Sequence, residues 1–418
     1  MRKGFAVCLM ASFILFIGDI SADASWLIED GFWPHEKISC LVCHPEAARF
    51  GHTDPKTADC RQCHPPHNDK IIHDGHLSVS CEACHLKSIL PLKDTRTGAV
   101  KWLRVEEGDS PGMIHNMIAE KTDLFCRRCH IRNNSVGAAA MILPPKSILC
   151  MPCHAATFSS SDPITISALI IFGFGMAAAF FYWLSGSWPG KESAGIVHKF
   201  VGLIGLIIRA AFSKTIFFVA RALFLDGLLQ LQLYRRSTMR WLVHGLIVWS
   251  LTLRFGWGMI ALIGSLWMPE TTLPWLMLNK NHPVCGFFFD FTGLMIISGA
   301  AMAIIRNIND KPIALPSLPK KDRLATGLIG TTVLIGFILE GIRIAMTNFP
   351  PGSGYAFIGN GVSRLFIGMN GLDSIYGYIW YVHAALTGMF IAYLPFSGMF
   401  HIILAPVVLA INAAQPRS

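Results

Sequence analysis

Charged side chains are scarce in this chain. Only 15% of its 418 residues are Asp, Glu, Lys or Arg, whereas 52% are hydrophobic. A soluble domain of ordinary composition carries about 25% charged residues. The composition therefore excludes an ordinary soluble protein and predicts an integral membrane protein, with room for two or three domains.

Acidic residues are scarcer than basic ones, and the formal net charge is +9. This excess does not indicate a nucleic-acid partner, because the Lys and Arg residues fall mainly in short loops between apolar runs. That distribution is typical of membrane topology, in which positive charge collects on the cytoplasmic side. We expect no nucleic acid among the partners.

Cysteines outside one repeated motif are almost absent. Ten of the 12 belong to five Cys-x-x-Cys-His pentads, and only Cys8 and Cys285 are left over, which argues against a disulfide framework. In such a pentad the two thiols bond the haem vinyl groups, and the adjacent histidine becomes the proximal iron ligand. Zinc ribbons also use Cys-x-x-Cys pairs, but they do not require a histidine after each second cysteine. The motif therefore predicts five haems c.

The residues of the five pentads follow directly from this motif. The thioether cysteines are Cys40, Cys43, Cys60, Cys63, Cys81, Cys84, Cys126, Cys129, Cys150 and Cys153, and the proximal iron ligands are His44, His64, His85, His130 and His154.

Histidines outside the pentads supply candidates for the opposite side of each iron. Between residues 25 and 162 they are His35, His52, His67, His73, His76 and His115. Six histidines for five irons fit bis-histidine ligation, which leaves no open site for substrate and indicates an electron wire. Spacing does not assign a histidine to a particular haem.

Residues 1–24 resemble a secretory signal peptide, with a basic start, an apolar stretch and a small-residue motif. An uncleaved anchor is the alternative. Haem c is attached outside the cytoplasmic membrane, so residues 25–162 are expected to form a periplasmic domain. We expect little regular secondary structure there, because the haems themselves form the core.

Residues 163–418 are expected to form an all-α membrane domain of five spanning helices. Apolar runs predict spans at residues 164–184, 241–267, 285–305, 324–346 and 375–412. Residues 200–233 carry recurring charges and predict an amphipathic helix at the cytoplasmic interface. The basic loop at residues 306–323 then faces the cytoplasm, as does the C-terminus, which places the protein in a bacterial inner membrane.

Histidines within the spans indicate haem b. His383 and His401 lie 18 residues apart, so in one continuous helix they would share a face, separated by about 27 Å. His244 and His401 are expected at matching depth and can share one haem b. His383 would hold a second haem b, and His282 is the only nearby candidate for its partner, so one or two haems b are expected.

Charged residues also occur within the predicted spans, where they are costly and normally pair or line a cavity. They are Arg254, Asp290, Glu340 and Arg343. One interpretation is a set of buried ion pairs that fix helix packing. The other is a quinol pocket, in which Arg254 or Arg343 neutralises haem propionates, Glu340 or Asp290 accepts protons, and His282 or Lys280 contacts a quinone oxygen.

The membrane half resembles the gamma subunit of respiratory nitrate reductase and the membrane cytochromes b of heterodisulfide reductase and dissimilatory sulfite reduction complexes. The motifs are Arg240-Trp-Leu-Val-His244, Asp290-Phe-Thr-Gly293 with Arg306, Gly336-Phe-Ile-Leu-Glu-Gly-Ile-Arg343, and His383 with Leu394-Pro-Phe-Ser397 and His401. The resemblance implies five spans, haem b between the second and fifth, and quinol chemistry on the periplasmic side. Where the nitrate reductase subunit has a second histidine, this chain has Arg254. By arrangement, the whole chain is similar to cytochrome b/c fusions of metal-reducing and sulfate-reducing bacteria.

Three functions are compatible with these features. The first is a membrane quinol:cytochrome c oxidoreductase that links menaquinol, haem b and the five-haem domain to periplasmic c-type cytochromes, in either direction. The second is an electron-transfer subunit that exchanges electrons with a cytoplasmic iron–sulfur subunit through the His244 and His401 haem. The third, a terminal reductase of a small oxyanion, requires an open iron, and the supply of histidines disfavours it.

Overall fold

A computed structural model describes residues 76–77, 79–80, 83, 89–94, 97–104, 126–156, 158–160, 162–186, 195–268, 271–309 and 322–414. The expected signal peptide and the first three pentads, apart from Ala83, lie outside these residues. So do the distal-ligand candidates His35, His52, His67, His73 and His115 and the middle of the basic loop at residues 306–323.

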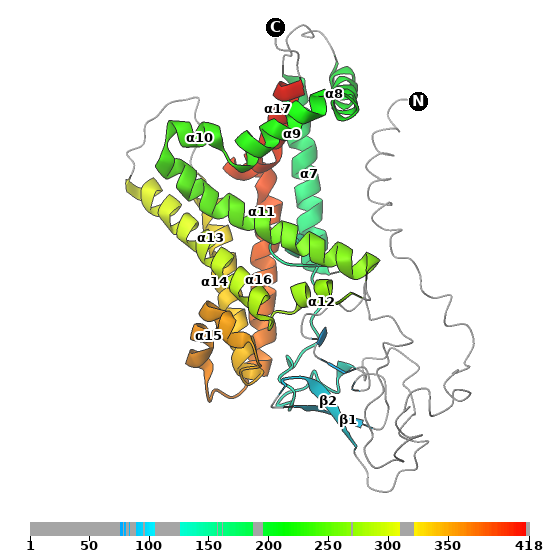
Figure 1. Ribbon diagram of the computed structural model, residues 1–418, viewed down its shortest axis with the longest axis vertical. Helices are drawn as coiled ribbons and strands as arrows, with labels where there is room; N and C mark the ends of the chain where they lie inside the picture. Colours follow the sequence, from blue (N-terminus) through cyan, green and yellow to red (C-terminus); the bar gives the residue numbers. More distant parts are fainter. Residues whose placement is uncertain are drawn as a thin grey trace, which may run out of the picture.

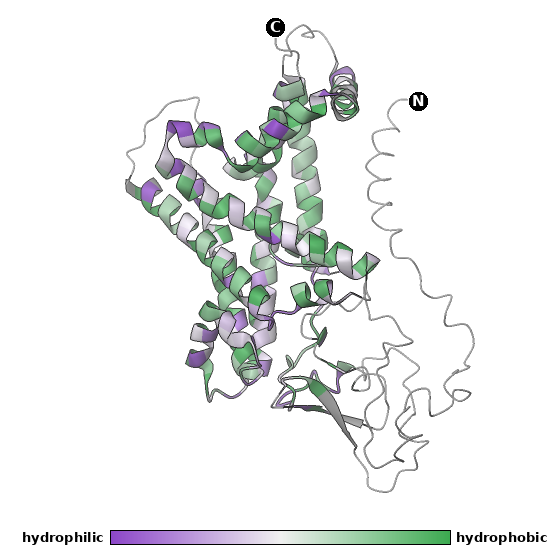
Figure 2. Ribbon diagram, in the orientation of Figure 1, coloured by the Kyte–Doolittle hydropathy of each residue, from purple (hydrophilic) through white to green (hydrophobic). Residues whose placement is uncertain are grey.

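Within the described residues, five helices are long and apolar enough to cross a membrane. They are α7 (Pro163–Ser185), α11 (Thr238–Trp267), α13 (Pro283–Asn309), α14 (Arg323–Met346) and α16 (Leu372–Tyr393) (Figure 1). Hydrophobic residues dominate these helices, whereas hydrophilic residues collect near their ends (Figure 2). The expectation of an all-α membrane protein is confirmed, and the spans begin and end within a few residues of their expected bounds, except at the end of the fifth.

Capping side chains determine where two of these helices begin. Asp162 accepts a hydrogen bond from Thr165 N at 2.9 Å, ahead of Pro163 at the first helical position. Asp322 likewise accepts from Ala325 N at 3.0 Å. An acidic side chain satisfies the free N–H groups of a first turn and complements its positive dipole end, so both helices start where the sequence changes from polar to apolar.

The long helices pack in a bundle in which α11 contacts α13, α14 lies against α13 and α16, and α7 packs on α16. Its centre contains Ile296, Ile329, Val333 and Phe337, all buried. The short helices α12 (Thr272–Leu278) and α15 (Phe357–Ser363) lie at the end of the bundle nearest residues 126–160 (Figure 1).

The fifth span is not one helix over residues 375–412, and this expectation was wrong. Helix α16 ends at Tyr393, two 3-10 turns follow (Leu394–Phe396 and Gly398–Phe400), and α17 (His401–Ala414) begins at the second histidine. Pro395 lacks an N–H for the helix ladder, and Ser397 is extended with its hydroxyl accepting from Met399 N at 3.1 Å. The alignment of His383 and His401 over five whole turns therefore does not hold.

The segment expected as one amphipathic helix over residues 200–233 is a series of short elements. These are α8 (Ile196–Ala211), α9 (Thr215–Ala222), a π-helical turn η6 (Leu223–Leu228) and α10 (Leu231–Arg236). The indole N–H groups of Trp241 and Trp249 on α11 donate to the carbonyl oxygens of Leu229 and Leu228, at 2.9 and 2.7 Å. These bonds tie the turn between η6 and α10 to the bundle.

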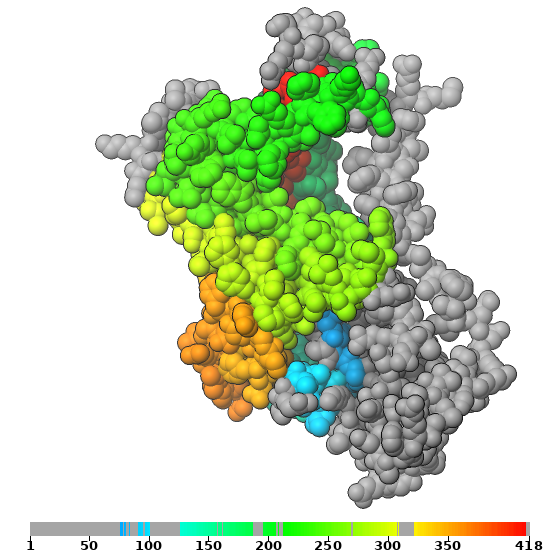
Figure 3. Space-filling model, viewed as in Figure 1, coloured from blue at the N-terminus to red at the C-terminus, as the bar shows by residue number. Residues whose placement is uncertain are grey.

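The described part of the N-terminal half contains little regular structure, as expected. It has one antiparallel hairpin, β1 (Ile89–Lys93) with β2 (Val100–Arg104), and a 3-10 turn η5 (Ile148–Cys150). Lys93 donates to the carbonyl oxygen of Thr347, just past α14, and Asn133 N donates to Asp373 of α16. In Figure 3 the described residues of this half lie directly below α11 and α12 and beside α15.

Candidate haem and quinol sites

Three pairs of histidine rings lie at one characteristic spacing. The ring centroids are 5.9 Å apart for His244 and His401, 6.2 Å for His76 and His130, and 6.3 Å for His154 and His383. Two imidazoles on opposite sides of one metal, with bonds of about 2 Å, have centroids about 6 Å apart. All three pairs therefore fit the axial ligands of an iron, which is what a bis-histidine haem requires.

The first pair joins α11 to the start of α17. The structure brings His244 and His401 together, as expected from their depth. His244 Nδ1 donates to Gln230 Oε1 at 2.8 Å, and His401 Nδ1 donates to the carbonyl oxygen of Gly398 at 2.7 Å. Such outer hydrogen bonds fix the tautomer and leave each Nε2 free to bind metal. Because the fifth span is broken here, the Gly398 carbonyl oxygen can accept this hydrogen bond from the His401 ring.

Gln230 is a functional residue that sequence reasoning missed. It is buried, with 5% exposure, and precedes α10 with a left-handed backbone (φ 56°). A long polar side chain held in a conformation that disfavours non-glycine residues points to a local constraint. Here that constraint is the bond to His244. Its sequence signal was weak, because Gln230 stands in an apolar stretch 14 residues before its partner.

The second pair lies within the N-terminal half. His130, the proximal histidine of the fourth pentad, faces His76, one of the six distal candidates. His130 Nδ1 donates to the carbonyl oxygen of Ala139 at 2.8 Å, which again leaves Nε2 for a metal. Cys126 and Cys129 are free thiols, as attachment of a haem requires.

The third pair crosses from the N-terminal half into the bundle. His154, the proximal histidine of the fifth pentad, stacks on Phe289 of α13 at 5.9 Å and faces His383 of α16. Cys150 and Cys153 are free thiols. Burial, with the nearby positive charge of Lys146, lowers the pKa of His154 well below its usual value. The ring is therefore neutral at physiological pH, which is the form that binds a metal.

The segment that carries the fifth pentad is packed into the bundle rather than resting on it. Met151, Ala155 and Ala156 share a buried apolar cluster with Ala261 and Leu262 of α11 and Leu278 of α12. A Cβ added at Gly258 of α11 would stand 3.1 Å from the carbonyl oxygen of His154. The absence of a side chain at that position lets the two backbones approach.

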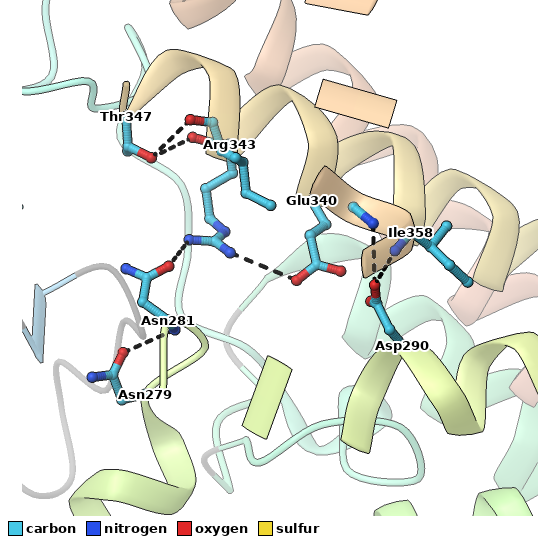
Figure 4. A network of polar contacts seen from close by, with 9 residues as sticks. Asn279, Asn281, Asp290, Glu340, Arg343, Thr347 and Ile358 are labelled. Atoms are coloured by element: carbon cyan, nitrogen blue, oxygen red, sulfur yellow. Dashed lines mark hydrogen bonds and ion pairs between the residues drawn. The ribbon is translucent and has the colours of Figure 1, made fainter. Parts of the chain in front are cut away.

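The charged residues of the bundle separate into two groups. In the first, Arg343 NH1 donates to Asn281 Oδ1 at 2.7 Å and Arg343 NH2 lies 3.6 Å from Glu340 Oε1. Figure 4 shows Glu340 between Arg343 and Asp290. Asp290 is fully buried, and its Oδ2 accepts from Ile358 N at 2.6 Å and Gly359 N at 3.1 Å. Asp290 therefore caps α15 from another helix.

Arg254 lies apart from this cluster. Its Nε donates to Thr292 Oγ1 at 2.8 Å, another guanidinium nitrogen donates to the Phe289 carbonyl oxygen, and its charge lies 5.3 Å from the Phe289 ring. It thus joins α11 to α13 beside the His154 and His383 pair.

His282 contributes a backbone hydrogen bond from its N–H to Asn279 O at 2.9 Å. His154, rather than His282, faces His383.

Two further features lie at the same end of the bundle. Burial and the neighbouring guanidinium of Arg343 lower the pKa of Lys93 to about 8. A hollow of about 290 Å³ is lined by residues 133, 134, 137, 345, 346, 348, 349 and 366–373. None of the residues expected to form the quinol site lines this hollow.

Comparisons with known proteins add no relative. No family model, no curated protein and no solved structure matches the chain.

Proposed function

We propose that this protein is a membrane quinol:cytochrome c oxidoreductase, which exchanges electrons between menaquinol in the membrane and c-type cytochromes in the periplasm. The observation that carries the proposal is the series of histidine pairs at 5.9 to 6.3 Å, which extends from the Cys-x-x-Cys-His segment into the membrane bundle. The bound haems would supply one-electron transfer along this series.

The protein residues would hold and orient these groups. His244 and His401 would hold a haem b, with Gln230 and the Gly398 carbonyl orienting the rings. Cys126 and Cys129 would attach the fourth haem c, with His130 and His76 as its ligands. Closed, six-coordinate irons suit electron transfer rather than substrate binding.

Quinol oxidation also releases protons, and Glu340 is placed to accept them. Its carboxylate lies beside Arg343 and Asp290 at the end of the bundle nearest the pentads, with 17% of its side chain exposed. Arg343 and Asn281 offer donors to a quinone oxygen. A carboxylate within reach of a bound quinol can act as the general base that takes up these protons.

The proposal is tested with purified protein and a reduced menaquinol analogue. We expect the analogue to reduce haem b and haem c in anaerobic stopped-flow spectra, and Glu340→Gln to slow this reduction by about 100-fold, since a general base typically contributes about that much or more. Haem content and dithionite-reduced spectra of the variant should match the parent. If neither haem class is reduced by the analogue, the proposed function is wrong.

A second function is favoured by one observation. His401 is exposed at the far end of the bundle, near α10, on which Arg235 and Arg236 are also exposed. An exposed ligand beside cationic side chains suits docking of an acidic redox partner, such as a cytoplasmic iron–sulfur subunit. Copurification of such a subunit, lost when Arg235 and Arg236 are replaced by Gln, would support this function over the first.

A further inference from the structure

We propose that His383 is the second axial ligand of the haem attached at Cys150 and Cys153. One covalently bound haem would then belong to the membrane bundle and occupy the place of a second haem b. This inference deepens the proposed function, and its test does not depend on quinol chemistry.

The geometry of His383 points to His154. Their ring centroids are 6.3 Å apart with planes at 59°, close to the spacing of the other two pairs. His154 follows Cys153 directly in the fifth pentad, so the iron held by this pentad lies next to His154. A ligand on the opposite side of that iron has to come from where His383 stands.

The surroundings hold the two rings in place. The ring of His154 stacks on Phe289 of α13. The backbone of His154 lies close to Gly258 of α11. His383 lies beside α14, where a Cβ at Gly336 would be 3.5 Å from His383 Cε1. His383 Nδ1 is buried and has no hydrogen-bond partner among the described residues. A buried ring nitrogen without a partner is costly, and a metal bound at that nitrogen would remove the cost.

This arrangement also accounts for Arg254. The resemblance noted from the sequence implies a second histidine at this position of the second span, where it would ligate a second haem b. Arg254 instead bonds Thr292 and stacks on Phe289, the ring on which His154 rests. His154 thus supplies the histidine that α11 does not have at position 254. The segment that carries His154 packs against Gly258, one helical turn after Arg254.

A covalent haem at this position would link the two halves of the molecule. The same group would be attached to the N-terminal half through Cys150 and Cys153 and ligated by the bundle through His383. Along α11, the 14 residues from His244 to Gly258 span about 21 Å, so this pair and the haem b pair lie at different depths. Electrons would then pass from the bundle to the N-terminal half through this shared haem, rather than across an interface between two separate haem groups.

The test compares haem content and iron spin state in the full-length protein and in His383→Ala. We expect the parent to contain five haems c and one haem b, by pyridine haemochrome assay. In His383→Ala both counts should stay the same, because the thioether bonds retain the haem. One haem c should change from low-spin to high-spin in the electron paramagnetic resonance spectrum of the oxidised protein.

Two further variants keep the test decisive. His383→Met supplies a different sixth ligand, so the high-spin signal should be absent and the reduction potential of one haem c should rise. His282→Ala should leave the spectra and potentials unchanged. A parent with two haems b, loss of a haem b in His383→Ala, or unchanged spin states in that variant would each overturn the proposal. Quinol oxidation is measured separately, so its failure would leave this result intact.

Discussion

Gln230 shows how a single residue can orient a candidate haem ligand. Its backbone is left-handed, its side chain is buried, and its Oε1 fixes the tautomer of His244 at 2.8 Å. A left-handed glutamine costs roughly 1 kcal/mol or more. The fold tolerates this because the carbonyl oxygens of the two preceding residues, Leu228 and Leu229, accept hydrogen bonds from tryptophans of α11.

Replacing Gln230 separates the backbone strain from the hydrogen bond. Gln230→Gly permits the same backbone conformation but removes the acceptor of His244 Nδ1. We expect haem b to bind about 10- to 100-fold more weakly, the usual effect of losing an outer-shell partner. The measurement is haem b retained per haem c after dilution in detergent. Gln232→Gly, at an exposed position of α10, is the matched control, and equal retention in both variants would contradict the role of Gln230.

At the same scale, some site residues were predictable and others were not. Residue type and depth were enough to pair His244 with His401. The pairing of His154 with His383 joins residues 229 positions apart, in segments expected to form different domains, and no spacing rule relates them. Asp290 was expected to lie within a span, and it is fully buried there, but its role as a cap of α15 depends on where a short connecting helix lies.

Among the elements, α11 contributes to two of the three histidine pairs. It holds His244 near its start and meets the fifth pentad at Gly258, where a Cβ would contact the backbone of His154 and Ala155 at 3.1 Å. Spans of this kind could be predicted because lipid demands about 20 apolar residues per helix. The break after Tyr393 also had a signal, since Pro395 and Ser397 stand close together, but the apolar run around them outweighed it.

Gly258→Leu tests the contact between α11 and the pentad. A leucine has no room against the backbone of His154, so the segment at residues 150–156 should shift away from the bundle. We expect one haem c to gain high-spin character and the protein to lose about 1–3 kcal/mol of stability through overpacking. Gly256→Leu is the control, because nothing lies within 4 Å of a Cβ at Gly256. The same spectrum in both variants would show that the contact does not position His154.

Across the whole molecule, the histidine pairs are distributed along the axis of the helix bundle. The His154 and His383 pair and the Glu340 cluster lie at the end of the bundle nearest the fifth pentad, and the His244 and His401 pair lies toward the other end, near α10. Attachment of haem c at residues 126–153, as proposed, would place this end of the bundle on the periplasmic side. Basic residues of the segment from α8 to α10 favour the cytoplasm for the opposite end.

Cysteine labelling tests this orientation directly. Gly354 is exposed at the pentad end with open space for a side chain, and Lys214 is exposed between α8 and α9. In cells with a permeabilised outer membrane, a membrane-impermeant maleimide should label Gly354→Cys but should label Lys214→Cys only after lysis. Background from Cys285 should be small, because that thiol is 1% exposed and the pentad thiols are expected to carry haem. Labelling both proteins after denaturation controls for thiol reactivity. If Lys214→Cys is labelled before lysis, α8 to α10 face the periplasm and the proposed orientation is wrong.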